Sequence, residues 1–372
     1  MTNVAVFFGG KSCENEISVL TGVFVLNLLD LERFTPVPVY VHTDGNFYTS
    51  AKMRDLNVFK KKDYASFTRV LFENGTMYAF NPKKERIKRK RKIDVALNCC
   101  HGGWGEGGGV SALMEMNGIP LASPALTPSG LFMDKALTKL VAKALSVPTV
   151  EYVRVQENDY KKRGAFLLKN IGVKLKYPVV IKPARLGSSI GISLAHTEEE
   201  AKTAIEAAFM LDDTAIIERY LSDKRDINCA AYSLNGEIFV SEPETAYGGG
   251  IYAFSDKYLT RKESERKPSP LNEETRKKIR AYTRTLYKRM NLSGIVRMDF
   301  LEEDGEVYLG EVNTVPGSLA YYLFCERATD AKNLFSDLLT DALATKKAEK
   351  AVLSTGILSS VRVTGKRGGV RL

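Results

Sequence analysis

The sequence predicts an α/β protein with some α+β character, built from two or three domains, with a parallel sheet in its N-terminal part. The chain has 372 residues, enough for two or three domains that each bury a core. Apolar residues make up 44% and charged residues 26%, as in an ordinary soluble globular protein. Strand-like and helix-like patterns alternate in the first hundred residues, which favours a parallel sheet.

The first unit is expected to span residues 1–134. Its predicted elements are strands at 3–8, 36–42 and 93–100 and a helix from Ile17 to Leu28. The last strand enters a loop, residues 101–109, that has six glycines in nine residues. Residues 103–108 fit the G-x-G-x-x-G pattern, but the match is weak in a stretch so rich in glycine, and no P-loop is present. We interpret the loop as one that approaches a ligand, not as a dinucleotide fingerprint.

A smaller mixed unit, 135–217, and a C-terminal unit, 218–372, are expected to follow. In the second unit we predict helices at 134–144 and after the capping box at Thr197, and strands at 177–183 and 214–219. In the third unit we predict a helix capped by Asn272, strands at 294–301 and 306–312, and a helix near 333–348.

Composition argues against several classes of protein. No run of 18 apolar residues exists, so no membrane-spanning helix is expected, and the apolar start is too short for a signal peptide. Five cysteines without a CxxC pair indicate a reduced cytoplasm rather than a disulfide framework or a zinc site. With three histidines, a multi-histidine metal centre is not expected.

The net charge of +10 is concentrated in two segments. Residues 83–92 hold eight basic residues and one acidic residue, and residues 343–372 hold seven and one. The first segment could bind an anionic polymer or a membrane surface, but we interpret it as a solvated loop before a strand. No aromatic residues lie between its basic ones, so no nucleic-acid partner is expected.

Two adjacent C-terminal strands carry the strongest argument for a site. Arg297 and Asp299 share one face of the first strand, and Glu311 and Asn313 share one face of the second. A hairpin centred near Gly305 places Asp299 opposite Glu311, where two carboxylates repel unless a cation lies between them. Carboxylate and amide oxygens suit a hard cation such as Mg²⁺. A solvated acidic face balanced by Arg297 is the alternative.

Two lysines are candidates for phosphate contacts. Lys182 lies inside an apolar strand and precedes the loop Gly187-Ser188-Ser189, which offers N–H and hydroxyl donors. Lys135 lies at the start of a helix, where an anion is favoured, although it could equally be a surface lysine. His101 could contact a ligand or simply end its strand.

Six motifs in order along the chain resemble those of the D-alanine–D-alanine ligase family. They are GGKSCENEIS at 9–18, HGGWGE at 101–106, MDK at 133–135, VIKPARLGSSIG at 180–191, RMD at 297–299 and EVNTVPG at 311–317. The resemblance runs from about residue 3 to 345. It implies an ATP-grasp architecture of three domains and a cytoplasmic carboxylate–amine ligase of peptidoglycan synthesis, which joins D-alanine to a second amino acid and forms a homodimer.

The resemblance also implies roles for single residues. For ATP they are Lys135, Lys182, Ser189, Lys257, the hinge Glu218 to Leu221, and Asp226, where the family has a glutamate. For two Mg²⁺ ions, or Mn²⁺ in their place, they are Asp299, Glu311 and Asn313. For the substrates and the reaction they are Glu14, Ser18, His101, Ser188, Tyr258, Arg297, Gly317, Tyr322 and Leu323. Lys257 and Tyr258 belong to a flap, residues 248–266. A tyrosine at position 258 is similar to the pattern of the peptide-forming members of the family.

Three departures concern the substrate and the end of the chain. After the histidine, Gly107 and Ser111 lie near where the family has an aspartate and a glutamine. Tyr322 replaces a serine that helps to bind the second carboxylate in the family. The tail beyond about Val352 exceeds the usual end. Two alternatives therefore stay open: a ligase for another second amine, such as D-serine, and a non-catalytic ATP-binding scaffold.

Overall fold

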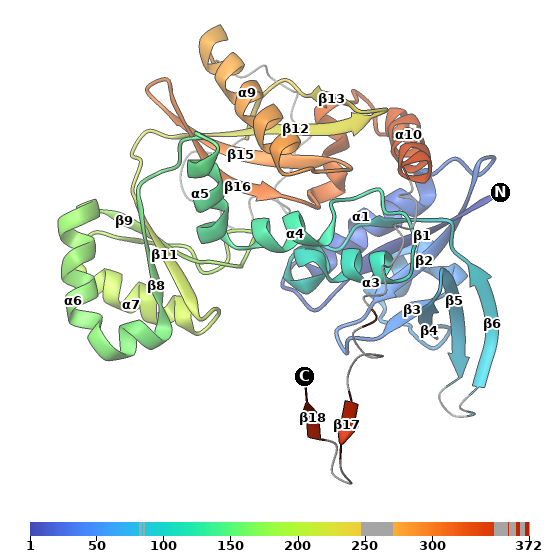
Figure 1. The fold of residues 1–372 in the computed structure, drawn as a ribbon. Helices are drawn as coiled ribbons and strands as arrows, with labels where there is room; N and C mark the ends of the chain where they lie inside the picture. The colour runs from blue at the N-terminus through green and yellow to red at the C-terminus, as the bar shows by residue number, and fades with distance from the viewer. Residues whose placement is uncertain are drawn as a thin grey trace.

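Three β-sheets organise the chain in the computed structural model, which describes residues 1–81, 84, 86–246, 271–345, 356, 362–364 and 369–371 (Figure 1). A seven-stranded sheet belongs to the N-terminal part, a four-stranded sheet to the middle and a five-stranded sheet to the C-terminal part. A short hairpin of β17 (Arg362–Thr364) and β18 (Gly369–Arg371) lies near the C-terminus. Among the described residues, no helix is both long and apolar enough to cross a membrane.

The first sheet has the strand order β6-β5-β4-β3-β2-β1-β7. Its strands are β1 (Thr2–Gly9), β2 (Phe34–Val41), β3 (Phe47–Thr49), β4 (Thr68–Glu73), β5 (Thr76–Asn81), β6 (Arg86–Lys92) and β7 (Val95–Asn98). The three predicted strands exist and are parallel to one another. The expectation of a parallel sheet is wrong for the rest, because β3 to β6 extend the sheet as antiparallel hairpins.

Helices cover both faces of the parallel strands. They are α1 (Asn15–Leu28), α2 (Leu56–Lys60) and α3 (Val110–Met116), with short helical turns at Ala51–Arg54 and Gly105–Gly109. The next helix, α4 (Leu126–Met133), instead places Phe132 in the core of the C-terminal sheet. Val4, Val6 and Phe8 of β1 pack in one core with α1, while Ala5 and Phe7 pack in another with α3. The alternation follows from the two-residue period of a strand, and burial of residues 4–8 on both faces of the sheet explains their continuous apolar sequence.

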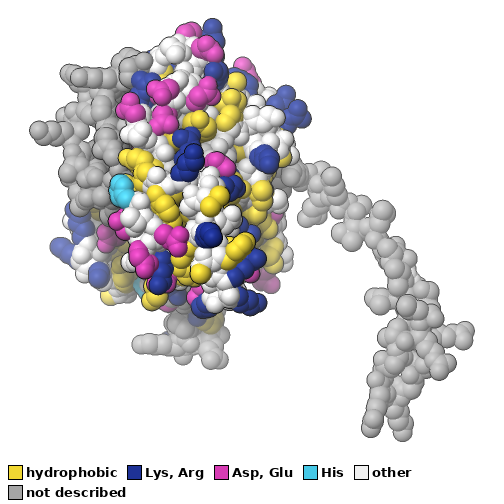
Figure 2. Space-filling model, turned by 90° about the vertical axis from the view of Figure 1, so that its left-hand side faces the viewer, with side chains coloured by type: hydrophobic (Ala, Val, Ile, Leu, Met, Phe, Trp, Pro, Cys, Tyr) yellow, Lys and Arg dark blue, Asp and Glu magenta, His cyan; other side chains and the backbone are white. Residues whose placement is uncertain are grey.

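The basic segment forms an edge strand, which corrects the predicted solvated loop. Residues 86–92 pair with β5 as β6 at the outer edge of the first sheet (Figure 1). Charged side chains on an edge strand oppose pairing with other chains, so strand formation and a strongly basic sequence are compatible. Elsewhere on the surface, basic and acidic side chains are interspersed, as Figure 2 shows for one face.

The second sheet has the order β10-β9-β11-β8, with antiparallel neighbours. Its elements are β8 (Tyr152–Gln156), α6 (Glu157–Leu175), β9 (Val179–Pro183), β10 (Ser193–Ala195), α7 (Glu198–Phe209) and β11 (Thr214–Arg219), preceded by α5 (Lys135–Ala144). As predicted, Thr197 caps α7, and its hydroxyl accepts a hydrogen bond from Glu200 N–H. Helices α6 and α7 pack their apolar faces on this sheet.

The third sheet carries the predicted hairpin. Its elements are β12 (Arg225–Leu234), β13 (Glu237–Val240), β14 (Glu244–Thr245), α9 (Glu273–Arg289), β15 (Val296–Glu303) and β16 (Glu306–Asn313), followed by 3-10 turns at Gly317–Leu323 and Ala328–Asp330 and by α10 (Ala331–Ala344). Asn272 caps α9 as expected. Helix α9 covers one face of the sheet, where Val296, Met298 and Phe300 are buried.

The register of β15 and β16 is confirmed where the site requires it. Asp299 pairs with Glu311, and Arg297 pairs with Asn313. The register shifts by one residue between Asp299 and the hairpin tip, which the sequence analysis did not anticipate. Gly310 allows this bulge, because a Cβ there would lie 3.0 Å from the Asp299 carbonyl oxygen.

Gly22 lets α1 lie close to β1, and this contact predicts a stability effect. A Cβ at Gly22 would lie 2.3 Å from Cγ of Phe8. We therefore expect Gly22→Ala to lower the free energy of unfolding by about 1–3 kcal/mol, measured by urea denaturation. Gly164→Ala in α6 is the control, because its Cβ would make ordinary contacts of 3.5 Å with Tyr160. Equal stability of the two variants would contradict this packing.

Candidate active site

The paired strands β15 and β16 bring the predicted metal ligands together. Arg297 donates from Nε to Asp299 Oδ1 (2.7 Å) and from Nη2 to Asp299 Oδ2 (2.8 Å). Asn313 Nδ2 donates to Asp299 Oδ2 (3.0 Å), and Lys135 Nζ lies 3.3 Å from Glu311 Oε2. The opposed carboxylates are thus neutralised by one cationic side chain each.

The donor set fits a hard divalent cation. Two carboxylates and one amide lie together on β15 and β16. Among the described residues, no group of three His, Cys, Asp or Glu side chains is placed to hold a metal, so this set of two carboxylates and an amide is the candidate. Oxygen donors of this kind suit Mg²⁺. Arg297 and Lys135 lie against these carboxylates, so the balance of Asp299 by Arg297 that the alternative interpretation expects is also present.

The two predicted phosphate lysines lie near the second and third sheets. Lys135 Nζ donates to the Leu186 carbonyl oxygen (2.6 Å), so it bridges the loop after β9 and strand β16. Lys182 Nζ donates to Glu218 Oε2 (2.6 Å). Burial alone would lower the pKa of Lys182, but the charge and hydrogen bond of Glu218, together with the charges of Glu311 and Asp226, raise that pKa overall.

Lys139 completes this group and was missed in the sequence. Its ammonium lies 2.7 Å from Glu218 Oε1, so Glu218 is held between two lysines. Burial would raise the pKa of Glu218, but the charges of Lys182 and Lys139 lower it to about 2. Both carboxylate oxygens are therefore used inside the protein. The spacing of Lys135 and Lys139, one helical turn apart, was the available signal.

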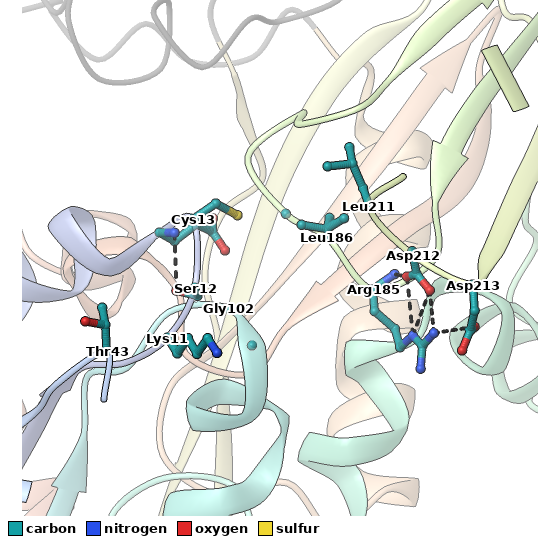
Figure 3. Close-up of a pocket in the computed structure, with 13 residues that line it drawn as sticks. Lys11, Ser12, Cys13, Thr43, Gly102, Arg185, Leu186, Leu211, Asp212 and Asp213 are labelled. Carbon is teal, nitrogen blue, oxygen red and sulfur yellow. Dashed lines mark hydrogen bonds and ion pairs between the residues drawn. The ribbon is translucent and has the colours of Figure 1, made fainter. Parts of the chain in front are cut away.

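Glu14 joins the first unit to the loop after β9. The Ser188 hydroxyl donates a hydrogen bond to Glu14 Oε1. A Cβ at Gly102 or at Gly187 would lie 2.6 or 2.7 Å from Glu14 Oε2, so a side chain at either position would displace the end of the Glu14 side chain. Beside Glu14 lies a cavity of about 650 Å³, in which Lys11, Ser12 and Cys13 face Leu186, Arg185 and Asp212 (Figure 3).

His101 is a buried histidine that holds the turn after β16. Its Nδ1 donates to the Val315 carbonyl oxygen (2.6 Å), and its Nε2 accepts from the Thr21 hydroxyl (2.8 Å). Burial lowers the pKa of His101 to about 4, so it is neutral near pH 7. Thr21 Oγ1 also accepts from Ser318 N–H (3.1 Å). The prediction that His101 contacts a ligand remains untested.

The turn after Gly317 is conformationally unusual. Ser318, Leu319 and Ala320 have φ values of 51°, 52° and 47°, a left-handed conformation that costs roughly 1–2 kcal/mol for each residue. The turn presents Tyr322, whose hydroxyl oxygen accepts from Arg297 Nη1 (3.1 Å). The side chain that departs from the family pattern therefore contacts the predicted catalytic arginine directly.

Glu106 is a second residue that the sequence analysis did not place in the site. Its carboxylate accepts from Gly102 N–H (2.8 Å) and from Val315 N–H (3.2 Å), so it links the glycine-rich loop to the turn after β16. Burial, together with the charge of Glu14, raises the pKa of Glu106 to about 7. Its position within the HGGWGE motif was the available signal.

The remaining predicted residues are placed less directly. Ser18 is fully buried and bonds to Gly9 N–H and the Cys99 carbonyl, so it lies beneath the site rather than in the cavity. Leu221 and Leu323 are buried, and Asp226 pairs with Lys224. Ser189 follows Ser188 in the same loop, where both have positive φ. Lys257 and Tyr258 lie outside the described residues.

Glu106 predicts a pH dependence of stability. The pKa of Glu106 is about 7 in the folded protein and has the ordinary value of 4.5 in the unfolded chain, so the folded protein binds this proton more tightly. The resulting stabilisation is full below pH 4.5 and is lost as the pH rises to about 7. Relative to Glu106→Gln, the wild type should therefore lose roughly 2–3 kcal/mol of unfolding free energy between pH 5 and 8. A difference independent of pH would contradict this assignment.

Comparison with known proteins covers nearly the whole chain. Residues 3–124 match the family model of the D-ala D-ala ligase N-terminus, and residues 141–344 match that of the C-terminus. The chain is 30% identical to a D-alanine–D-alanine ligase of Thermosipho melanesiensis, over 96% of this chain and 98% of that protein. It is 33% identical to one of Caldicellulosiruptor bescii, over 84% and 86%.

Solved structures agree with this relationship. The D-alanine–D-alanine ligase of Helicobacter pylori superposes with a TM-score of 0.74 at 26% identity, covering 94% of this chain and all of that one. The VanG D-Ala:D-Ser ligase of Enterococcus faecalis gives 0.72 at 25%, covering 93% and 99%. The resemblance read from the motifs is confirmed, and the chain belongs to the D-alanine–D-alanine ligase family of ATP-dependent ligases with the ATP-grasp fold.

Proposed function

We propose that this protein joins D-alanine to a second D-alanine and converts ATP to ADP and phosphate in the same reaction. The observation that carries the proposal is the pair of opposed carboxylates, Asp299 and Glu311, next to Lys135 and within the same group of charges as Lys182. Such an arrangement suits phosphoryl transfer, which depends on positioning and charge neutralisation.

The proposed division of labour follows three units with boundaries at 134 and 217. Residues 1–134 would bind the first amino acid, 135–217 would cover the nucleotide, and 218–372 would carry the metal ligands. Lys135, Lys182 and Ser189 would contact the phosphates, and Lys257 of the flap would reach the γ-phosphate. Since Glu218 is engaged by two lysines, the backbone from Glu218 to Leu221, with Asp226, would contact the nucleoside.

Asp299, Glu311 and Asn313 would hold two Mg²⁺ ions, which neutralise negative charge on the transferred phosphoryl group when bound. In the first step a carboxylate oxygen of D-alanine attacks the γ-phosphorus, the bond to ADP breaks, and an acyl phosphate forms. Glu14 would hold the ammonium group of this substrate. Ser188 and Tyr258 would fix its orientation, as the Ser188 contact with Glu14 supports.

In the second step the amine of the acceptor attacks the acyl carbon. A C–N bond forms, a proton leaves the nitrogen, and the C–O bond to phosphate breaks. Arg297 and the Gly317 N–H would stabilise the oxyanion. His101 and Ser18 would support the pocket through the contacts described above, with Tyr322 and Leu323 near the acceptor.

A different second amine is the alternative that one observation favours. Tyr322 occupies one nitrogen of Arg297, while Asp299 holds the other two. The contacts open to an acceptor's carboxylate are therefore altered where the family has a serine. D-Serine or another amino acid would fit this alternative. We also propose a cytoplasmic homodimer, on the basis of the family alone.

Product analysis by mass spectrometry tests the function. The protein would be incubated with Mg·ATP and D-alanine, alone and with a panel of amines, while ADP is measured. D-Alanyl-D-alanine formed in equal amount to ADP is the expected result. A mixed product, with none from D-alanine alone, would change the acceptor. ADP and product absent for every amine would leave the scaffold alternative.

Glu311→Gln is expected to abolish metal-dependent turnover, by at least about a hundredfold, because one of the opposed carboxylates is lost. Its fold should be retained, as circular dichroism would check. Glu306→Gln, at the exposed start of β16, is the control. Full activity in Glu311→Gln would refute the metal assignment.

Tyr322→Ser is expected to change the relative kcat/KM of competing acceptor amines by about tenfold, because it removes a contact of Arg297. KM for ATP should not change. Unchanged acceptor preference in an active variant would show that Tyr322 has no role in selection.

A further inference from the structure

Lys139 is a lysine buried inside the protein rather than on its surface. It lies on α5, and its side chain is 1% exposed. Its ammonium contacts Glu218 Oε1 (2.7 Å) and the Val150 carbonyl oxygen (3.3 Å), and it lies 5.1 Å from the centre of the Tyr152 ring. Burial of a charged lysine is costly, so a structural role alone would be met more cheaply by an apolar side chain.

The charges around Glu218 do not balance. Lys139 and Lys182 each carry one positive charge, and the carboxylate between them carries one negative charge. Without Lys139, the contact of 2.6 Å between Lys182 and Glu218 would form a neutral pair. With Lys139, the group of three carries a net charge of +1.

Of these three side chains, Lys182 is the most exposed to solvent. Lys139 is 1% exposed and Glu218 is 5% exposed, whereas Lys182 is 17% exposed. Lys182 is therefore the member that an external ligand can reach. Lys139 also interacts electrostatically with Lys182 and with Lys135, while Glu311 and Asp226 act on Lys182, so the charge of Lys139 contributes to the field at Lys182.

We propose that Lys139 is a positioning residue of the nucleotide site, which neutralises Glu218 from the inside so that Lys182 retains its charge toward the phosphates of ATP. The inference rests on the proposed function, since it assumes that Lys182 faces a phosphate. It concerns the charge of the nucleotide, and not the amino acid substrates.

Lys139→Met tests the proposal, because methionine fills similar space without charge. Dissociation constants for ATP, ADP and adenosine would be measured by calorimetry with Mg²⁺ present. We expect the constants for ATP and ADP to rise about tenfold or more, and that for adenosine to change less than about twofold. KM for D-alanine should be unchanged. Lys143→Met, on the exposed face of α5, is the control and should alter none of these values.

A purely structural role predicts a different pattern. It would weaken adenosine as much as ATP, or lower only the active fraction of the protein, and either result would overturn the proposal. The double variant Lys139→Met with Glu218→Gln is compared with Glu218→Gln alone, so that any effect of Glu218 itself on the nucleotide cancels, and this pair also serves if Lys139→Met alone does not fold. Because the negative charge is absent from both, we expect the two to bind ATP within about threefold of each other. ATP binding at least tenfold weaker in the double variant, with equal adenosine binding in the two, would contradict the charge argument.

The outcomes separate this inference from the proposed function. If the wild type binds ATP and the variants change ATP affinity as expected, but no dipeptide forms, the role of Lys139 is supported and the ligase assignment is overturned. If the wild type forms the dipeptide and Lys139→Met binds ATP as tightly as the wild type, the ligase assignment is supported and the role of Lys139 is overturned. Wild-type protein that binds no ATP would overturn both.

Discussion

Asp299 and Glu311 face each other across two neighbouring strands, and the repulsion between these carboxylates is the constraint on which the rest of the site depends. Each needs a positive partner, and the two partners come from different places. Arg297 lies two residues away on the same strand, whereas Lys135 comes from the start of α5. Lys135 also donates a hydrogen bond to the loop after β9. The side chain that neutralises Glu311 therefore links the second sheet to the third.

A second set of buried groups fixes the first unit against the same hairpin. His101 and Glu106 both bond to Val315, one through its carbonyl oxygen and the other through its N–H. Thr21 bonds to Ser318, where the left-handed turn begins. Burial keeps these hydrogen bonds away from water, and together they offset the conformational cost of a turn that no glycine relieves after Gly317. The position of Tyr322 against Arg297 follows from that turn.

The sequence was most informative where local periodicity determines which side chains share a face. The two-residue period placed Asp299 opposite Glu311, but the bulge at Gly310 arises from backbone geometry that no pattern revealed. Strands β3 to β6 were missed as a sheet extension, because β3 has three residues, β4 and β5 each bury one side chain, and the edge strand β6 is basic and lacks apolar alternation. The family resemblance of the motifs predicted that Lys182 and Glu14 belong to the site. The motifs did not show that Lys139 and Glu218 meet, because those residues are distant in sequence and come together only on folding.

The central claim is that this arrangement activates a carboxylate by transferring a phosphoryl group to it. Incubation with Mg·ATP and D-alanine labelled with ¹⁸O in its carboxylate tests that claim directly. If an acyl phosphate forms, one labelled oxygen leaves with phosphate for each dipeptide made, because that oxygen bonded to phosphorus before the amine displaced it. Mass spectrometry of the released phosphate should therefore show one ¹⁸O per molecule. Dipeptide formed together with unlabelled phosphate would contradict the account.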